Sequence, residues 1–331
     1  MISNRVVIVG GGAAGIFAAL ACAEAGDKGE IVVLEKGAQC LAKVRISGGG
    51  RCNVTHACFD PREFATRYPR GGRELLGPFR QFQAADTVAW FESHGVALKT
   101  EDDGRMFPVT DSSQTVVDCL LREAAASGVK VRCQCGVESA VRNATGGFTL
   151  GLSPGGPLDC DRLLLALGGC RTPALGALAV LLGHTLESPV PSLFTFQIEV
   201  PWLRALAGVT LPSVVLAVPD AGLRERGPLL ITHAGLSGPA VLRLSAWGAR
   251  KLHETDYRFT LQVNWLPDLN PEQIAAELEA RRVKQAPRLV VNSPLPSIPA
   301  RLWEALVLAA GLPGGTRNAA LSRAAVHTLG Q

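Results

Sequence analysis

The sequence predicts an α/β protein in which a nucleotide-binding domain built on a parallel sheet is followed by a domain richer in β-strands. Two observations predict this. Near the N-terminus, an uncharged β-branched run leads at once into a glycine-rich turn, an apolar helical run and a second short strand. From about Pro189, prolines separate several strand-like runs. With 331 residues, 47% of them hydrophobic, the chain is long enough for two domains, expected at 1–188 and 189–331.

The first expected unit is strand, turn, helix, turn and strand. Val6 to Val9 has the composition of a strand that is buried on both faces of a parallel sheet. The helical run from Ile16 to Ala25 stops at Gly26, and Ile31 to Leu34 makes the second strand. The two strands should therefore lie side by side, with the helix packed across them.

The turn of this unit, Gly10-x-Gly12-x-x-Gly15, has the spacing of a dinucleotide site. Gly10 permits the sharp turn, Gly12 lets the backbone approach a pyrophosphate, and Gly15 lets helix and strand pack closely. The amides near Ala13 and Ala14 open the helix, where unpaired N–H groups and the helix dipole attract phosphate. We therefore expect a dinucleotide at this turn.

An acidic residue stands where such a site needs one. Glu35 follows the second strand, twenty residues after Gly15, and can accept hydrogen bonds from a ribose diol. An export signal is the competing interpretation, because the uncharged run from Val6 to Ala23 follows Arg5 and contains a poor lipoprotein-like box at 19–22. The glycines near the start of that run and the acid in register favour the nucleotide-binding unit.

Composition limits the classes of function. A net charge of +4 is small for this length and gives no nucleic-acid signature. The nine cysteines form no regular framework and predict reduced thiols in the cytoplasm. Cys133-x-Cys135 lacks a second pair and the six histidines are scattered, so no metal site is expected. We expect a small-molecule substrate, without a nucleic-acid or membrane partner.

A second informative stretch runs from Lys43 to Thr55, KVRISGGGRCNVT. Three consecutive glycines after Ser47 exclude a stable helix or strand and can present backbone amides to an anion. Lys43, Arg45 and Arg51 would add positive charge. A flexible surface loop is the other interpretation, and composition alone does not decide between them.

The motifs together resemble a known family. KVRISGGGRCNVT, after GGGAAG and the strand end LEK, is similar to the signature of bacterial FAD-dependent oxidoreductases whose relatives are described as aminoacetone oxidases and bile-acid 3-oxo-Δ4,6 reductases. Three later segments match as well, and the matches span most of the chain: GRMFPVTDSSQTVVDCLL at 104–121, LLLALGGC at 163–170, and THAGLSGPAVLRLS at 232–245.

The resemblance implies a flavoprotein oxidoreductase with FAD as cofactor, and NAD(P)H is a candidate electron donor. Cys52 is either a redox-active thiol near the flavin or a buried structural cysteine. No residue stands out as a catalytic acid or base. The residues that the family pattern places near the cofactor, with Val137 beside the adenine, are Lys36, Ser47, Gly49, Gly50, Arg51, Cys52, Asn53 and Val137.

The remaining elements of the first domain follow from local patterns. A polar stretch of loop and helix at 60–100 is expected before a helix at 114–126, which Ser112 or Ser113 can cap. A further parallel strand is expected at 129–133. Strands at 137–143, 148–153 and 158–167 then form a meander that returns to the main sheet. Together with the family resemblance, which places such a meander in this position, this implies a Rossmann-like, two-dinucleotide-binding flavoprotein fold.

The second domain resembles the family's inserted β-rich and helical domain. Strands are expected at 193–200, 209–218 and 257–263, and amphipathic helices at 272–282 and 301–310. In GLSGP, Pro239 opposes a hydrolase serine and predicts the first residue of a helix to about Leu252, with Ser237 or Gly238 as its cap. Arg281, Arg282 and Lys284 are interpreted as a solvated helix face.

Two departures from the family pattern bear on activity. Relatives continue with a threonine-glycine-glycine strand and a GGYN helix start, which are not found up to Gln331, and the loop after Arg171 is shorter and lacks an acid. The resulting expectation is an FAD-dependent oxidoreductase on an unidentified small molecule. The alternatives are a truncated, impaired flavin-binding relative that holds FAD weakly, and an NAD-dependent dehydrogenase. Substrate and oligomeric state stay open.

Overall fold

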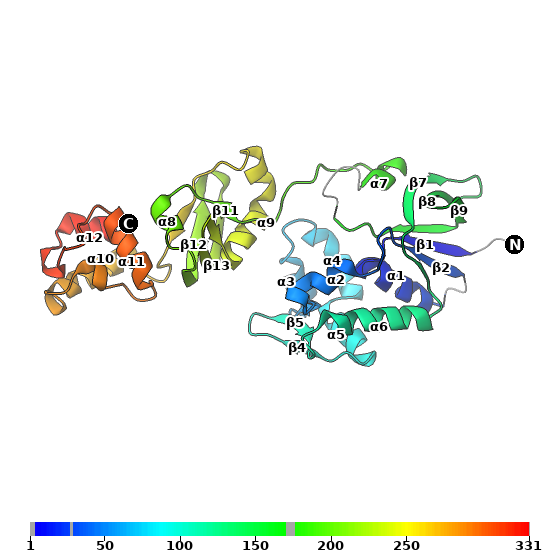
Figure 1. The fold of residues 1–331 in the computed structure, drawn as a ribbon, viewed down its shortest axis with the longest axis horizontal. Helices are drawn as coiled ribbons and strands as arrows, with labels where there is room; N and C mark the ends of the chain where they lie inside the picture. The colour runs from blue at the N-terminus through cyan, green and yellow to red at the C-terminus, as the bar shows by residue number, and fades with distance from the viewer. Residues whose placement is uncertain (1–3, 27–28, 170–175, 331) are drawn as a thin grey trace. The chain divides into compact units, whose positions relative to one another are not determined.

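The computed structural model describes residues 4–26, 29–169 and 176–330. The chain divides into two compact units, residues 1–189 and residues 190–331 (Figure 1). The loop expected after Arg171 falls partly on residues 170–175, which lie outside the described residues. Each unit has a hydrophobic core of its own, and the α/β fold class predicted from the sequence is confirmed.

The first unit is organised around a four-stranded parallel sheet in the order β10-β1-β2-β6. The predicted strand–helix–strand unit forms as expected, because its uncharged strands occupy the centre of this sheet. The strands are β1 (Arg5–Val9), β2 (Glu30–Leu34), β6 (Lys130–Arg132) and β10 (Arg162–Leu165).

Both faces of this sheet are covered, which explains why its central strands are apolar after their first residues, Arg5 and Glu30. Val6 and Ile8 pack with apolar residues of helices α1 (Ala13–Glu24) and α6 (Ser113–Ala126) on one face. The alternate residues of β1 face the antiparallel meander β7 (Gly136–Arg142), β8 (Phe148–Ser153) and β9 (Pro157–Cys160) on the other (Figure 1). Ser112 caps α6 by accepting the N–H of Gln114.

The single strand predicted at 158–167 forms two separate strands in the structure. The run 158–167 divides at Asp161, so that β9 closes the meander and β10 joins the main sheet beside β1. The Asp161 carboxylate accepts the backbone N–H of Arg5 at 2.7 Å and fixes this crossing. The chain thereby reaches the same sheet edge as the glycine-rich turn.

The segment between β2 and α6 adds helices and a small antiparallel sheet in the order β3-β5-β4. Its strands are β3 (Thr55–His56), β4 (Leu98–Thr100) and β5 (Arg105–Pro108). The helices are α2 (Ala42–Ile46), η1 (Ser47–Gly50), α3 (Pro61–Ala65), α4 (Gly72–Gln81) and α5 (Ala84–Ser93), and α7 (Ala177–Leu181) follows β10. Asp60 caps α3 by accepting the N–H of Arg62.

The second unit contains a five-stranded antiparallel sheet in the order β11-β14-β13-β12-β15. The expected strands at 193–200 and 257–263 shorten to β11 and β15, and β13 was not predicted at all. The strands are β11 (Phe196–Gln197), β12 (Thr210–Val218), β13 (Leu223–Thr232), β14 (Gly235–Ser237) and β15 (Gln262–Asn264). Pro239 opens α9 (Pro239–Glu254) as predicted, with Gly238 in the cap position.

The remaining helices pack into the same core as this sheet. Trp303 is buried there and donates its indole N–H to the Val290 carbonyl at 2.6 Å. No helix within the described residues is long and apolar enough to cross a bilayer. The helices are α8 (Pro201–Arg204), η3 (Pro219–Ala221), α10 (Pro271–Lys284), η4 (Val290–Asn292), α11 (Ala300–Ala309), η5 (Asn318–Ala320) and α12 (Arg323–Gly330).

Candidate functional site

The three motif glycines of the β1–α1 turn face different surroundings. A Cβ atom on Gly10 would lie 2.3 Å from the Ala166 carbonyl oxygen, and one on Gly15 would lie 1.9 Å from the Gly10 oxygen. These two glycines therefore allow the turn to pack against β10 and α1 to pack against the turn. A Cβ on Gly12 would meet nothing within 4 Å, and its φ of −80° is an ordinary one. Gly12 alone of the three faces open space.

The start of α1 offers uncompensated backbone donors to that space. The amides of Ala13 and Ala14 form no hydrogen bond to another described residue, and the first turn of α1 contains no acidic side chain. Gly12, in the cap position, has no side chain to satisfy them. Unpaired N–H groups and the positive end of the helix dipole favour an anion here.

Glu35 braces the same turn from the end of β2. One carboxylate oxygen accepts the Gly11 N–H at 2.8 Å, and the other accepts the Gly37 N–H at 2.6 Å. Because each oxygen accepts only one of these hydrogen bonds, each keeps a free lone pair for a further donor. The side chain is half-buried, so a ligand can still reach it. The carboxylate predicted to hold a ribose therefore also has a structural role, since it fixes the glycine turn against the following loop.

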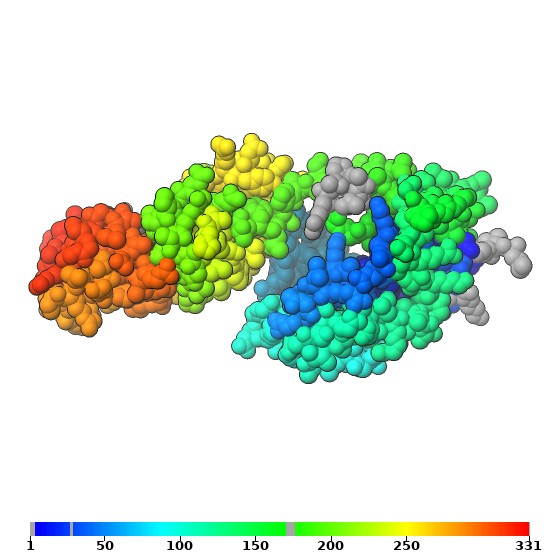
Figure 2. All heavy atoms as spheres, in the orientation of Figure 1, coloured from blue at the N-terminus to red at the C-terminus, as the bar shows by residue number. Residues whose placement is uncertain are grey.

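These groups border a cavity of about 1020 Å³ within the first unit, called the first-unit cavity below. This volume is at the upper end of the ~300–1,000 Å³ typical of small-molecule sites, so a dinucleotide-sized ligand can be accommodated. Figure 2 shows the first unit hollowed between its blue N-terminal segments and its green later segments. The lining includes Gly10, Gly11, Gly12, Ala13, Ala14, Glu35, Gln39, Lys43, Ser47, Cys52, Asn53, Phe91, Val116, Leu120, Ala166 and Gly168.

Only part of the SGGGRCN segment lines the first-unit cavity. Gly48, Gly49 and Gly50 have φ of 55°, 69° and 86°, a left-handed run that only glycine adopts at low cost. The turn closes through the Cys52 N–H, which donates to the Ser47 carbonyl at 3.0 Å. Ser47, Cys52 and Asn53 line the cavity, whereas Gly49, Gly50 and Arg51 are absent from its lining.

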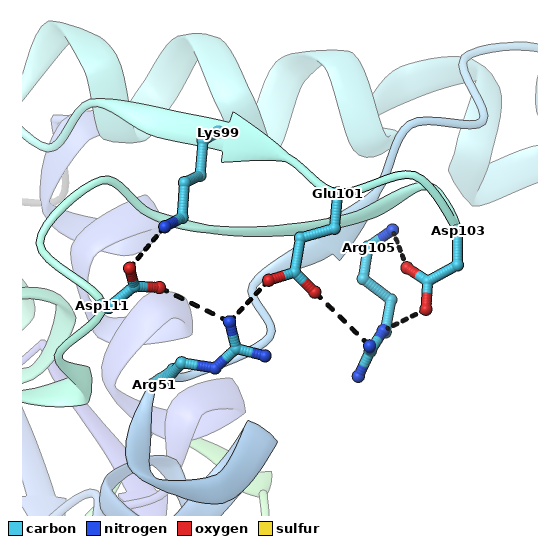
Figure 3. Close-up of polar contacts among 6 residues, drawn as sticks. All are labelled: Arg51, Lys99, Glu101, Asp103, Arg105 and Asp111. Atoms are coloured by element: carbon cyan, nitrogen blue, oxygen red, sulfur yellow. Dashed lines mark hydrogen bonds and ion pairs between the residues drawn. The ribbon is translucent and has the colours of Figure 1, made fainter.

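Arg51 points instead to the β4–β5 hairpin, where it anchors the glycine loop (Figure 3). Its guanidinium lies 2.5 Å from Glu101 and 3.5 Å from Asp111, and 4.0 Å above the centroid of the Phe107 ring. Lys99 also pairs with Asp111, and a hydrogen bond from Lys99 holds the pKa of that carboxyl below its usual range. The positive charge expected to face an anion is thus neutralised by carboxylates.

Lys43 brings to the first-unit cavity the positive charge that Arg51 does not. It lines the first-unit cavity from α2, and its ammonium would lie 3.2 Å from a Cβ on Gly168, three residues after β10. Among the described residues it forms no ion pair. Lys43 was noted as a basic residue of the loop but was not among the predicted site residues, because composition does not show which of three cations faces inward.

Three other predicted residues lie apart from the cavity lining. Gly15 is buried beneath the turn, Lys36 is exposed beside Gly136, and Val137 packs into the core of the meander. The apolar lining from α5 and α6 was missed, since Phe91, Val116 and Leu120 read as ordinary helix core in the sequence.

Two thiols occur at or beside this region. Cys52 is buried in the lining, and burial raises its thiol pKa. Cys40 is buried behind Gly11, with its Sγ 3.8 Å from the Sγ of exposed Cys133. Burial raises the pKa of Cys40 to about 12, so its thiol is protonated at neutral pH. No group of three His, Cys, Asp or Glu side chains within the described residues is placed to hold a metal ion.

Comparison with known proteins identifies the family. The model of the HI0933-like protein Rossmann domain matches residues 4–190, and that of the HI0933-like protein barrel and H2TH domain matches residues 190–331. The chain belongs to the HI0933-like family. This is a family of FAD-dependent flavoprotein oxidoreductases, so the predicted resemblance and cofactor class are confirmed.

The named relatives act on two kinds of substrate. The chain is 33% identical to the ribosomal RNA dihydrouridine synthase of Escherichia coli over 310 residues, which cover 91% of this chain and 72% of that protein. It is 30% identical to the 3-dehydro-bile acid delta(4,6)-reductase of Clostridium scindens over 279 residues, 82% of this chain and 66% of that protein. It is 27% identical to the ribosomal RNA dihydrouridine synthase of Haemophilus influenzae, covering 90% and 73%.

Proposed function

We propose that this member of the HI0933-like family binds FAD in the first-unit cavity, with the pyrophosphate against the opening of α1. The observation that carries this is the open space in front of Gly12, beside the unsatisfied amides of Ala13 and Ala14. A cavity wide enough for a dinucleotide begins at that point. The residues present fit the cofactor that the family uses.

Named residues then have distinct tasks in holding FAD. Glu35 has free lone pairs for the adenosine ribose while it braces the turn. Lys43 is placed to balance the negative charge of the pyrophosphate, because it is the cation in the lining without an ion-pair partner among the described residues. Arg51, Gly49 and Gly50 act indirectly, by fixing the loop that carries Ser47 and Asn53. Bound FAD supplies the transfer of hydride and electrons.

We further propose that the reaction is reduction of a carbon–carbon double bond conjugated to a carbonyl group, in a uridine of ribosomal RNA. The names of the relatives support the reaction class, since a uridine ring becoming dihydrouridine and a Δ4,6 bile-acid enone both undergo this change. Two of the three named relatives are ribosomal RNA enzymes, and the one from Escherichia coli is 33% identical against 30% for the bile-acid enzyme, which favours RNA over a steroid. The expectation of no nucleic-acid partner came from a net charge averaged over the whole chain.

Three measurements test these proposals in order. Purified protein should show the absorption bands of oxidised flavin and release FAD on denaturation. Under anaerobic conditions NADH or NADPH should bleach those bands, which would identify the electron donor. Ribosomal RNA from a strain that lacks the gene should then gain dihydrouridine when it is incubated with the reduced protein. The product is detected by mass spectrometry of nucleosides. FAD with no gain in RNA, but turnover of a 3-oxo-Δ4,6 steroid, would replace the RNA substrate by a small molecule.

A further inference from the structure

The net charge of the chain is unevenly distributed. Residues 1–189 contain nineteen basic and nineteen acidic side chains, whereas residues 190–331 contain fourteen and ten. The asymmetry is strongest in residues 281–331, where seven arginines and lysines accompany a single acidic residue, Glu304. A mean charge near neutrality therefore conceals one strongly basic segment, which follows the sheet of the second unit.

Three of these seven cations have partners inside the protein. Arg281 is buried, pairs with Glu277 at 2.9 Å and donates to the Pro294 carbonyl at 2.9 Å. Arg282 pairs with Glu279 at 2.7 Å, and Arg301 donates to a backbone carbonyl at 3.1 Å. The expected solvated helix face at 281–284 is therefore wrong for Arg281, which is a core residue that closes α10 onto the following loop.

The other four cations are Lys284, Arg288, Arg317 and Arg323, called the basic surface below. All four are exposed, and within the part of the chain that the structure describes none forms an ion pair with a carboxylate. Cations that are held by no internal partner keep their full charge available to a ligand.

Backbone hydrogen bonds bring most of the basic surface together. Leu289 and Arg317 form an antiparallel bridge, and the Asn318 N–H donates to the Arg288 carbonyl at 2.9 Å. The Asn318 side chain also donates to the Gln285 carbonyl at 3.1 Å, beside Lys284. Buried Asn318 thus holds two segments, about thirty residues apart in sequence, against each other. Arg323 begins α12, which packs against α10.

A glycine turn leads into this surface. The Thr316 N–H donates to the Pro313 carbonyl at 3.0 Å and closes the turn around Gly314 and Gly315. Both glycines are exposed, and a Cβ on Gly315 would meet nothing within 4 Å. The backbone can therefore be approached closely at Gly315, two residues before Arg317, as contacts to a phosphate chain require.

We propose that the basic surface, together with the Gly314–Gly315 turn, is a docking site for the sugar–phosphate backbone of RNA. The proposal rests on the proposed ribosomal RNA substrate, and it assigns to the second unit a role in holding that substrate. Several cations on adjoining segments, none of which forms an ion pair with a carboxylate among the described residues, match a polyanion with regularly spaced charges. Contacts of this kind position RNA and carry no sequence information.

The test compares two triple variants of the full chain with FAD bound. Lys284→Gln/Arg288→Gln/Arg317→Gln removes three charges from the basic surface. The matched control, Arg62→Gln/Arg73→Gln/Arg80→Gln, removes three exposed charges from α3 and α4 of the first unit. Binding is measured by filter retention of deproteinised bacterial ribosomal RNA between 0.05 and 0.3 M salt. Flavin content and thermal melting confirm that each variant is folded and loaded.

The surface variant should bind RNA roughly ten- to a hundred-fold more weakly at about 0.15 M salt, and its salt slope should fall by about two, as expected for three lost phosphate contacts. The control should bind as wild type, and Arg288→Lys/Arg317→Lys should retain binding, since it keeps the charge. If the surface triple variant does not fold, the single variant Arg317→Gln should still lower the slope by about one.

Other outcomes would overturn the proposal at different levels. Wild-type protein that does not bind RNA would remove both the docking site and the RNA substrate. Tight RNA binding that the surface variant shares, or that the control loses equally, would refute this location alone. Binding to phosphatidylglycerol vesicles without binding to RNA would assign the basic surface to a membrane and not to RNA.

Discussion

Replacement of Gly12 by valine should separate cofactor binding from folding. A Cβ at this position meets nothing within 4 Å, and the φ of −80° is accessible to any residue. We therefore expect the free energy of unfolding to fall by only ~0.5–1 kcal/mol, because valine is a poorer residue than glycine in a helix cap position. The added side chain occupies the space in front of the α1 amides.

The magnitude of the binding defect follows from the contacts that would be lost. Each hydrogen bond to a charged group contributes about 1.5–3 kcal/mol, and two such contacts, to the amides of Ala13 and Ala14, would be blocked. The expected loss is therefore ~3–6 kcal/mol, which corresponds to a Kd increased by about 10²- to 10⁴-fold. Titration of apo-protein with FAD, followed by quenching of flavin fluorescence, measures this directly.

Two further glycines serve as controls for this experiment. Gly77→Val places a Cβ in open space on α4, outside the cavity lining. It should leave FAD binding unchanged and should alter the free energy of unfolding only by the difference in helix propensity between glycine and valine. Gly15→Val should unfold the first unit, because its Cβ would lie 1.9 Å from the Gly10 oxygen. A Gly12→Val protein that binds FAD within threefold of wild type would refute the placement of the pyrophosphate.

Further predictions concern the groups around the turn. Glu35→Ala should weaken FAD binding by about 1.5–3 kcal/mol in the same titration, while Glu35→Gln should bind more tightly than Glu35→Ala; an unchanged Kd would remove Glu35 from the site. Arg51→Ala should lower the midpoint of denaturant melts and make the glycine loop more sensitive to protease, because a cation–π contact and exposed ion pairs are lost. Unaltered cleavage would show that the loop does not need this anchor. Burial raises the pKa of the Cys40 thiol, so iodoacetamide at pH 8 should label exposed Cys133 and spare Cys40. Equal labelling in peptide mass spectrometry would contradict the burial of Cys40.

The sequence by itself determined the strand–turn–helix unit and its cofactor class. The signals there lie close together in sequence: residues 6–9 are uncharged and β-branched, as in a strand covered on both faces, and the glycine spacing and Glu35 follow within thirty residues. Ser112 at the start of α6 and Pro239 at the start of α9 were likewise readable, since caps depend on immediate neighbours.

Prediction from the local sequence failed where a strand depends on its pairing partners. In β13 the charged residues 224–226 and the Gly227-Pro228 pair hid a ten-residue strand, which forms because β12 and β14 pair with its two edges. Ser237 or Gly238 was expected only as a helix cap and no strand was predicted before it, yet residues 235–237 form β14. Gly235 fits there because a Cβ would lie 2.3 Å from the Phe196 carbonyl oxygen on β11.

Tertiary structure alone decided which side chains face the ligand. In the sequence, Lys43 and Arg51 are equivalent cations flanking three glycines, but the fold brings Glu101 and Asp111 to Arg51 and leaves Lys43 at the cavity. The reason is physical: a cation is directed by whichever carboxylates the chain brings within ion-pair distance, and those lie about fifty to sixty residues away in sequence.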